Sequence, residues 1–441
     1  MEERVMNILE FDKIIDKLSG YAESSLGKNK VRTLTPSDDI NEIEIWQEET
    51  ENAINLILKY GNPPLFGIYE VKSAAHHAKL GGCLSAGQIL QIGEGLRVSK
   101  ALQVYVENDD ASVLTGEIRS LYVNDGLEKE ISNAIISAEE ISDTASHKLF
   151  SIRRSMVAKQ DQVKIKLNQI MADAAKNGYL RENIITMRQG RYVLPVKAES
   201  RRGVNGVVHD QSGSGATIFI EPLAIVNLNN EITQLEIEEK AEIQRILLEL
   251  SGEIAEFADE IANNQSHLQH LDFSFAKAKY ALEIHGSRPT FNEDRIIDIT
   301  NARHPLLGKN VVPINIRLGE EFNTLVITGP NTGGKTVTLK TLGLLTIMAQ
   351  SGMQIPATEK SKLGIFSSIY ADIGDKQSIE MSLSTFSASM TNIVSIINSA
   401  TDSSLVLFDE LGAGTDPTEG AALAMAILEY MTDYDIRTVA T

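Results

Sequence analysis

The sequence predicts a multidomain protein in which an α-helical core with long antiparallel lever helices precedes an α/β domain built around a P-loop. Three observations predict this order. Short amphipathic helical patterns fill residues 1–125. Two long helical seams then flank a small β-rich insertion. From about residue 286, strands, glycine turns and helices alternate to the end, as in α/β domains.

Length and composition set the outer limits. A chain of 441 residues is long enough for several domains with large cores. No run of about 18 apolar residues is present, and the charged N-terminus is unlike a signal peptide, so we expect no membrane segment and a cytoplasmic location. The single cysteine, Cys83, excludes an internal disulfide and a cysteine metal cluster.

The first segment, residues 1–125, is predicted to be a helical core and carries no motif that we can assign. Its adjacent His76 and His77 lie in an alanine-rich helical context. Neighbouring residues on a helix point about 100° apart, because a helix has 3.6 residues per turn, so this pair makes a poor chelate.

Residues 126–180 and 228–285 carry the long patterns, which predict an outgoing and a returning lever helix with coiled-coil-like seams. Residues 181–227 between them are rich in β-branched runs and glycine turns, which predicts a small β module at the tip of an antiparallel arm. The seam residues are Leu149, Ile152, Met156, Val163, Leu167, Ile170 and Ala174, and then Ile243, Leu247, Leu250, Ile254, Phe257 and Ile261.

Charge is distributed unevenly along this arm. The whole chain has a net charge of −19, yet residues 148–202 hold thirteen Lys and Arg against four Asp and Glu. Residues 231–260 are acidic. The basic segment is either a polyanion-binding surface or an ordinary solvated helix face. On the first interpretation the tip cations would grip the polyanion: Arg188, Arg191, Lys197, Arg201 and Arg202.

The stretch Gly329–Thr336 reads G-P-N-T-G-G-K-T and satisfies the P-loop pattern. We expect a buried strand at Leu325–Ile327 before it and a helix from Val337 after it. Glycines let the backbone fold around phosphate oxygens, and the helix N-terminus supplies N–H donors. Lys335 should reach the β- and γ-phosphates of ATP, and the Thr336 hydroxyl should bind Mg²⁺. The predicted ATP-binding residues are Gly329, Pro330, Asn331, Thr332, Gly333, Gly334, Lys335, Thr336 and Val337.

A second motif follows about 70 residues later. Ser404–Phe408 is an apolar strand that ends in Asp409 and Glu410, the Walker B pattern. Asp409 can hold Mg²⁺ through water, and Glu410 can polarise the attacking water, which favours hydrolysis over mere nucleotide binding. The stretches at residues 381–390 and 412–417 are, on composition alone, serine- and glycine-rich loops.

Four stretches together resemble the ATPase of the MutS family: "TGPNTGGKT", "SLSTFSASM", "LVLFDELGAGTDP" and "ARHPLL". The similarity is closer to the second bacterial paralogue, the anti-recombination and ribosome-collision branch, than to the mismatch-repair branch. Residues 191–232 also resemble the clamp region of that paralogue, so the resemblance covers the whole chain.

The resemblance implies an ABC-type P-loop ATPase whose two sites form at a head-to-head homodimer interface. Ser384 would contact the γ-phosphate bound by the opposite subunit, and Gly412–Asp416 would form the loop crossing that interface. Arg303–Pro305 would lie near the adenine, which Val312 and Pro313 would contact. The β module would be part of a clamp, and the implied partners are branched DNA and stalled, collided ribosomes with their rRNA. The implied roles are suppression of homologous recombination and splitting of ribosomes.

Two departures from the wider family define the alternatives. Mismatch-repair members read a mispair with an N-terminal Phe-x-Glu motif, and no such motif lies near the start of this chain. Phe291–Glu293 matches the letters but lies in the linker before the ATPase, and the match is interpreted as chance. A mismatch sensor therefore remains the alternative, with a non-hydrolysing nucleotide-binding scaffold as a second. Residues 436–441 resemble the strand after Walker B, which the family follows with a switch histidine, the rest of the ATPase and, in this branch, a nuclease domain. We therefore expect an N-terminal fragment truncated within the ATPase domain (residues 286–441), without nuclease activity of its own.

Overall fold

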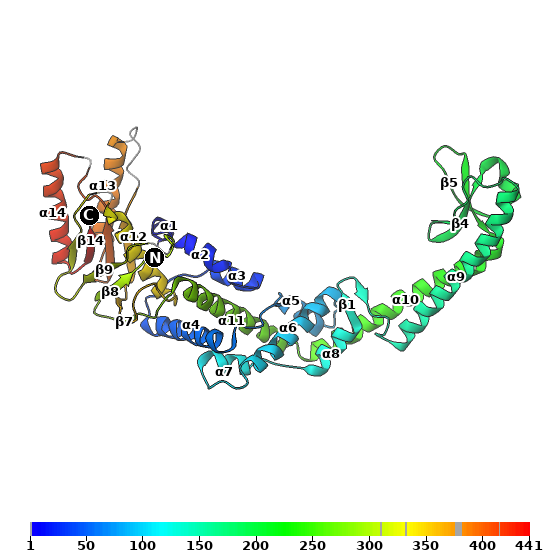
Figure 1. The fold of residues 1–441 in the computed structure, drawn as a ribbon, viewed down its shortest axis with the longest axis horizontal. Coiled ribbons are helices and arrows are strands. Elements are labelled where there is room, and N and C mark those ends of the chain that lie inside the picture. The colour runs from blue at the N-terminus through cyan, green and yellow to red at the C-terminus, as the bar shows by residue number, and fades with distance from the viewer. Residues whose placement is uncertain (1, 309–310, 331–332, 375–381, 414) are drawn as a thin grey trace. The chain divides into compact units, whose positions relative to one another are not determined.

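The computed structural model describes residues 2–308, 311–330, 333–374, 382–413 and 415–441, with side chains left undescribed at 382–388. The chain divides into two compact units (Figure 1). Unit 1 comprises Met1–Glu70, Arg97–Val123 and Asn263–Thr441, and unit 2 comprises Val71–Leu96 and Asn124–Ala262. This division is coarser than the five segments expected from the sequence, whose boundaries stay predictions.

The N-terminal part of unit 1 is helical, as expected. Its helices pack around an apolar cluster that includes Leu56, Leu114 and Phe275. Side chains cap three of the helices as described, because Ser24 accepts a hydrogen bond from the Gly27 N–H, Asp39 accepts one from the Asn41 N–H and Ser112 accepts one from the Thr115 N–H. The helices are α1 (Glu3–Ile8), α2 (Phe11–Ser19), α3 (Ser25–Arg32), α4 (Ile40–Tyr60), α7 (Val113–Arg119), the end of α6 (Ala86–Tyr105) and most of α11 (Ala258–Ile284).

A histidine–carboxylate cluster joins three of these helices. His270 on α11 contacts Glu117 of α7 through Nδ1, at 2.9 Å, and Glu49 of α4 through Nε2, at 3.2 Å. His267, one turn earlier, also contacts Glu117 at 2.9 Å. Burial by itself lowers the pKa of His270, but its bonds to the two carboxylates outweigh burial and raise the pKa to about 9. His270 is therefore a cation in this core at neutral pH.

The C-terminal part of unit 1 contains two four-stranded sheets. The first is parallel, in the order β10 (Thr324–Val326), β14 (Arg437–Ala440), β13 (Ser404–Phe408) and β12 (Ser368–Asp372). Its helices are α12 (Lys335–Gln350), α13 (Ser382–Ser399) and α14 (Pro417–Asp433). The second sheet is mixed, in the order β7 (Thr290–Asn292), β11 (Lys362–Gly364), β8 (Ile297–Ala302) and β9 (Ile314–Leu318).

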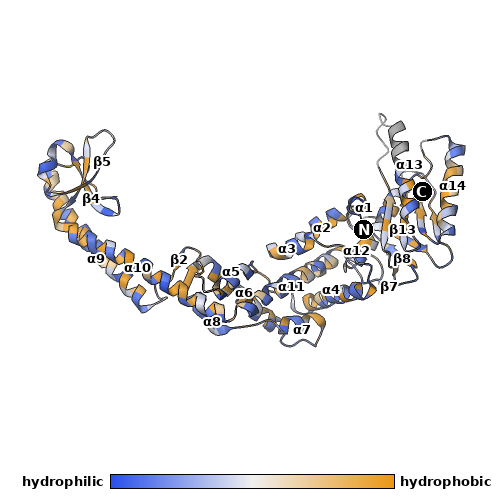
Figure 2. Cartoon of the chain, turned by 180° about the vertical axis from the view of Figure 1, so that it is seen from behind, coloured by the Kyte–Doolittle hydropathy of each residue, from blue (hydrophilic) through white to orange (hydrophobic). Residues whose placement is uncertain are grey.

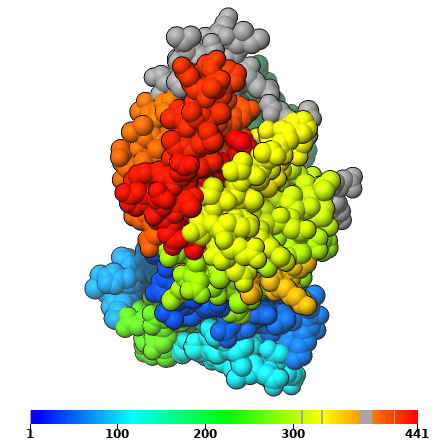
Figure 3. Space-filling model, turned by 90° about the vertical axis from the view of Figure 1, so that its left-hand side faces the viewer, coloured from blue at the N-terminus to red at the C-terminus, as the bar shows by residue number. Residues whose placement is uncertain are grey.

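Every residue of β13 is buried, and apolar residues concentrate on this strand in Figure 2. Figure 3 shows one face of this region, on which α14 forms the red surface. The Thr432 hydroxyl of α14 lies 2.8 Å from that of Thr324 on β10, so this helix is held against the outermost strand of the parallel sheet as described.

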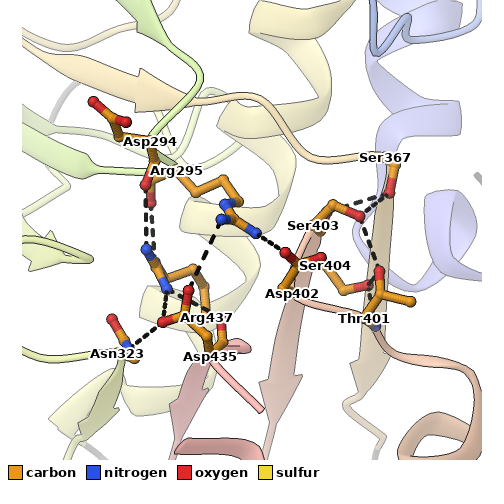
Figure 4. Close-up of polar contacts among 10 residues, drawn as sticks. All are labelled: Asp294, Arg295, Asn323, Ser367, Thr401, Asp402, Ser403, Ser404, Asp435 and Arg437. Atoms are coloured by element: carbon orange, nitrogen blue, oxygen red, sulfur yellow. Dashed lines mark hydrogen bonds and ion pairs between the residues drawn. The ribbon is translucent and has the colours of Figure 1, made fainter.

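A buried arginine joins the two sheets (Figure 4). The guanidinium of Arg437, at the start of β14, donates to the main-chain oxygens of Asp294 and Arg295 in the turn between β7 and β8. It also donates to the Asp435 carboxylate at 2.9 Å. Arg295 in turn bonds Asp402, just before β13, at 3.0 Å. The turn that carries Arg295 is therefore fastened to two strands of the parallel sheet.

Unit 2 consists of a helical base, a helical arm and a β module. The arm is formed by the long helices α9 (His147–Lys176) and α10 (Leu223–Glu256), which lie side by side (Figure 1). The module is an antiparallel sheet in the order β3 (Thr186–Arg188), β4 (Arg191–Lys197), β6 (Thr217–Pro222) and β5 (Gly206–Gln211), with a short helix η1 (Ala198–Gly203). The base has α5 (Lys72–Lys79), the start of α6, α8 (Asp125–Ala134) and a hairpin of β1 (Ile135–Ser137) and β2 (Glu140–Ile141).

Three local expectations need correction. The returning pattern forms two helices, because α10 ends at a non-helical Phe257 and α11 begins at the next residue. Of its predicted seam, Leu250, Ile254 and Ile261 are buried, whereas Ile243 and Leu247 are only partly buried and Ile246 is buried in their place. The strand before the P-loop is also not buried, since β10 is an outer strand and Val326 is 51% exposed. No helix among the described residues has the length and apolarity needed to span a bilayer.

The stability contributed by His270 should depend on pH. Because its folded-state pKa is raised from 6.5 to about 9, the contribution is fully present below pH 6.5 and is lost as the pH rises through about 9. We expect His270→Gln to lower the free energy of unfolding by about 3 kcal/mol at pH 6 and by much less at pH 9.5. Urea unfolding of both proteins at the two pH values measures this difference.

Buried Lys277, whose pKa burial lowers to about 8, has the opposite pH dependence. It is present in both proteins, so its contribution cancels in the comparison. An equal deficit at pH 6 and pH 9.5 would show that the charge on His270 contributes nothing.

Candidate phosphate site and cationic module

The P-loop lies between β10 and α12. Gly329 and Gly334 have φ values of +144° and +80°, which a side chain would make costly, so the glycines of the motif are needed where they stand. Lys335, the first residue of α12, folds back over the loop and donates from Nζ to the Gly329 carbonyl oxygen at 2.9 Å. Asn331 and Thr332 lie outside the described residues.

Asp409 is brought to the P-loop from the end of β13. Its Oδ2 accepts a hydrogen bond from the Thr336 hydroxyl at 2.7 Å, and its Oδ1 accepts one from the Thr441 hydroxyl at 2.6 Å. Asp409 as a whole residue is 7% exposed. A hydroxyl and a carboxylate in contact beside a phosphate loop are a donor set of hard oxygens, which suits Mg²⁺.

Glu410 follows with an unusual backbone. Its φ is +51°, in the left-handed region that non-glycine residues rarely adopt. Its N–H donates to the Thr441 hydroxyl at 2.9 Å, so the same threonine holds both acids. Such a conformation persists only where neighbouring contacts enforce it, and it is found most often at functional sites.

Two parts of the predicted dimer interface are only partly described. Ser384 lies on α13, but its side chain is outside the described residues. In the loop Gly412–Asp416, Gly412 has a φ of +83°, and a Cβ there would lie 2.4 Å from the Gly420 carbonyl oxygen. Asp416 caps α14 by accepting from the N–H groups of Thr418 and Glu419. The end of this loop is thus fastened to its own helix.

The predicted adenine residues lie at a separate cavity. Arg303, His304 and Pro305 line a cavity of about 830 Å³ that also receives Lys17 and His285, and its lining includes none of the described P-loop residues. Burial lowers the pKa of His304. Val312 is 79% exposed. The adenine assignment stays a prediction.

In unit 2, many of the cations along the arm are paired with acids. On α9, Lys148 bonds Glu242 at 3.1 Å, Arg153 bonds Glu239 at 2.7 Å and Lys159 bonds Glu231 at 2.5 Å, all three acids being on α10. Cations further along α9 pair with acids that come earlier on α10, as expected for two antiparallel helices. Part of the basic segment thus neutralises the acidic helix.

Two of the five predicted tip cations also have internal partners. Arg191 donates to both carboxylate oxygens of buried Glu221, at 3.0 and 3.1 Å. Glu221, which is 1% exposed, further bonds His209 at 2.5 Å and Asn229 at 2.6 Å. Arg188 lies over the Phe219 ring, 4.1 Å from its centroid, and pairs with Asp210 at 3.3 Å.

The remaining three tip cations differ. Arg201 and Arg202 are exposed on η1, and Lys197 is half-buried at the end of β4. Among the described residues, none of the three has a side-chain hydrogen bond or an ion pair. Arg154, Lys166 and Arg181 are exposed and share this property. The cations available to an external anion are therefore concentrated toward the module end of the basic segment.

Comparison with known proteins gives a family match for the phosphate-site region and relatives for the whole chain. The family model MutS domain V matches residues 325–440, which contain the P-loop, Asp409 and Glu410. "Endonuclease MutS2" of Alkaliphilus oremlandii is 50% identical over 446 residues, covering all of this chain and 56% of that protein. The protein of the same name from Acetivibrio thermocellus is 49% identical over 447 residues, with the same coverage. The chain is a homologue of the MutS2 proteins. It spans about half the length of the curated relatives that it matches.

Sequence reasoning missed two residues that organise the phosphate site of this MutS2 homologue. The sequence pattern predicts Thr441 only as part of a strand, whereas its hydroxyl contacts Asp409 and accepts the Glu410 N–H. Asp372, at the end of β12, anchors α13 by accepting from Ser389 at 2.6 Å and from Asn392 at 2.9 Å. The available signal was an acid that directly follows an apolar strand, as in the Walker B motif. The partners of Asp372, however, are too distant in sequence to be read from a pattern.

The internal pairing of Arg191 predicts a structural role that Arg201 and Arg202 lack. We expect Arg191→Gln to destabilise the module by about 3 kcal/mol, because buried Glu221 loses its cation. Arg201→Gln with Arg202→Gln should leave stability unchanged. Hydrogen exchange of the β4 and β6 amide protons measures this stability.

The double variant Arg191→Gln, Glu221→Gln should recover part of the loss, because it removes both charges together. Exchange rates in Arg191→Gln that match those of the parent would contradict the internal role.

Proposed function

We propose that this chain is the ATP-hydrolysing part of a homodimeric clamp that binds branched DNA or the rRNA of stalled, collided ribosomes. The contact between Thr336 and Asp409 carries the first half of the proposal. These residues are 73 positions apart and meet at 2.7 Å beside a glycine loop, which is the arrangement that nucleotide hydrolysis needs. The match to MutS domain V supports the same assignment.

The predicted ATP-binding residues take distinct roles. The glycine loop and the start of α12 would receive the phosphates through main-chain N–H groups. Lys335 would turn its ammonium from the Gly329 carbonyl oxygen to the β- and γ-phosphates. Thr336 and Asp409 would hold Mg²⁺, which neutralises phosphate charge when bound.

Glu410 is the proposed general base. It directly follows the acid that contacts Thr336, and its N–H is bound to the Thr441 hydroxyl that also contacts Asp409. A carboxylate there would orient water toward the γ-phosphate and accept its proton. The homodimer completes the site in this proposal, with Ser384 acting on the nucleotide of the opposite subunit. Asp372 supports that role by holding α13, the helix on which Ser384 lies.

The nucleic-acid half rests on the unpaired cations of the module and on the similarity to the MutS2 proteins. Exposed arginines without internal partners can exchange their counterions for phosphates. Suppression of homologous recombination, splitting of ribosomes and a cytoplasmic location belong to the same proposal. Endonuclease activity, which the names of the relatives state, is proposed only for the full-length protein and for no residue described here.

Nucleotide binding and hydrolysis should separate by mutation. We expect Lys335→Ala to weaken binding of an ATP analogue by about tenfold to a hundredfold, because a charged contact is lost. Glu410→Ala should bind ATP as the parent does, hydrolyse it about a hundredfold more slowly or worse, and accumulate an ATP-bound dimer. Calorimetry, phosphate release and light scattering measure the three quantities.

Lys340→Ala is the matched control, because Lys340 lies on the same helix and pairs with Glu10 at 3.6 Å instead of facing the loop. Hydrolysis by Glu410→Ala at the parent rate would disprove the base assignment.

The nucleic-acid surface should be measurable through salt. Replacing Arg201 and Arg202 by Gln should weaken binding and flatten the slope of log K against log salt by about 1.4 to 1.8. Branched DNA and purified ribosomes should be titrated separately. A control pair, Arg32→Gln with Lys129→Gln, removes the same charge elsewhere. An unchanged slope in the tip variant would exclude these arginines from the binding surface.

A further inference from the structure

A second cavity lies where the β module meets the arm helices. It has a volume of about 420 Å³ and opens between the end of α9, the residues after η1 and the start of α10, all within unit 2. Its lining includes Asp173, Asn177, Tyr179, Gly203, Asn205 and Leu223. Arg201 and Arg202, the exposed cations without internal partners, directly precede Gly203 in the chain. The cavity is thus next to the proposed phosphate-binding arginines.

One wall of the cavity is aromatic and apolar. The Tyr179 ring lies against the backbone of Gly203 so closely that a Cβ on Gly203 would be 2.5 Å from the ring Cδ2 atom. Leu223, at the start of α10, is 55% exposed and lines the same cavity. Flat rings stack on such walls, and a cavity of this volume can hold a nucleobase.

The rest of the lining carries hydrogen-bonding groups. The Asn205 carboxamide forms no side-chain hydrogen bond among the described residues, and it is exposed. Asn177 donates from Nδ2 to the Asp173 carbonyl oxygen at 2.9 Å, which leaves its Oδ1 available as an acceptor. The Asp173 carboxylate adds further acceptors, and its nearest cation, Lys176, is 3.9 Å away.

The hydrogen-bond acceptors of the cavity and the arginines beside it favour different parts of a nucleotide. A carboxylate at the rim repels a phosphate but accepts hydrogen bonds from the amino groups of bases. The arginines beside the cavity attract phosphates. A base inside, with its backbone phosphate outside at Arg201 or Arg202, satisfies both sets of groups.

We propose that this cavity is a subsite for one unstacked nucleobase of a single-stranded segment. The inference rests on the proposed function, since it assumes that the module binds nucleic acid, and it adds the class of ligand. Bases within a duplex are paired and stacked and cannot enter such a cavity, whereas unpaired bases at junctions and in RNA loops can. The module would therefore favour strands with exposed bases over regular duplex.

The test compares three probes of equal length by fluorescence anisotropy with the full chain: a single strand, the same strand made abasic, and its duplex. The parent should bind the single strand about fivefold to a hundredfold more tightly than the abasic strand, which carries the same charge. Tyr179→Leu should remove most of this preference, Tyr179→Phe should keep it, and duplex affinity should stay constant in both variants.

Two further variants guard against a folding artefact. Asn205→Ala removes a side chain that makes no internal bond, and it should reduce the preference without changing thermal stability. Gly203→Ala should reduce the preference because its Cβ displaces the Tyr179 ring.

The outcomes separate this inference from the proposed function. If Tyr179→Leu and Asn205→Ala keep the parent's preference while the Arg201, Arg202 variant loses affinity, the base subsite is disproved and the cationic surface stands. If the parent binds none of the three probes, the base subsite is disproved, whereas the proposed ATPase and its binding of branched DNA or ribosomes are decided by their own measurements.

Discussion

The position of β14 between β10 and β13 is the constraint on which the phosphate site depends. Thr438 of β14 is in register with Thr324 on one side and with Val406 on the other. All three strands run in parallel, so their carboxyl ends share one edge, where the P-loop, Asp409 and Thr441 follow them. Thr441 then bonds Asp409 and receives the Glu410 N–H. At the opposite end of β14, buried Arg437 fastens the strand to the turn of the mixed sheet.

Local patterns in the sequence were sufficient for the strand, loop and helix of the P-loop, for β13, and for the existence of both arm helices. They failed where long-range contacts or small angular differences decide the outcome. On α10, Leu250 and Ile254 are buried as predicted, but Ile246 takes the place of Ile243 and Leu247, because a helix with 3.6 residues per turn drifts from a strict heptad. Exposure of β10 depends on its outer place in the sheet, which strand composition does not reveal. The contact between Asp372 and Ser389 depends on the packing of α13 beside β12, which the sequence pattern does not reveal.

The cationic module shows why a charge count is an incomplete guide to a binding surface. Arg191 and Arg201 contribute equally to the sum, yet Arg191 is bound to buried Glu221 and Arg201 is bound to no described residue. Glu221 also collects His209 and Asn229, so it joins β4, β5, β6 and α10 at one point. Arg191 therefore stabilises the β module, on whose surface Arg201 is exposed. Sequence alone could not assign these roles, because the partners of Arg191 lie 30 and 39 residues away.

The ion pairs between α9 and α10 have a consequence for the kinetics of encounter. Pairs such as Lys159 with Glu231 behave as short dipoles whose field falls off faster than that of a single charge. Several charges along the arm thus compensate one another in pairs, while most of the exposed cations without a described partner lie toward its module. At physiological ionic strength the Debye length is only about 8 Å, so a diffusing polyanion senses the cations locally. It would be captured end-on, with few unproductive collisions along the rest of the arm.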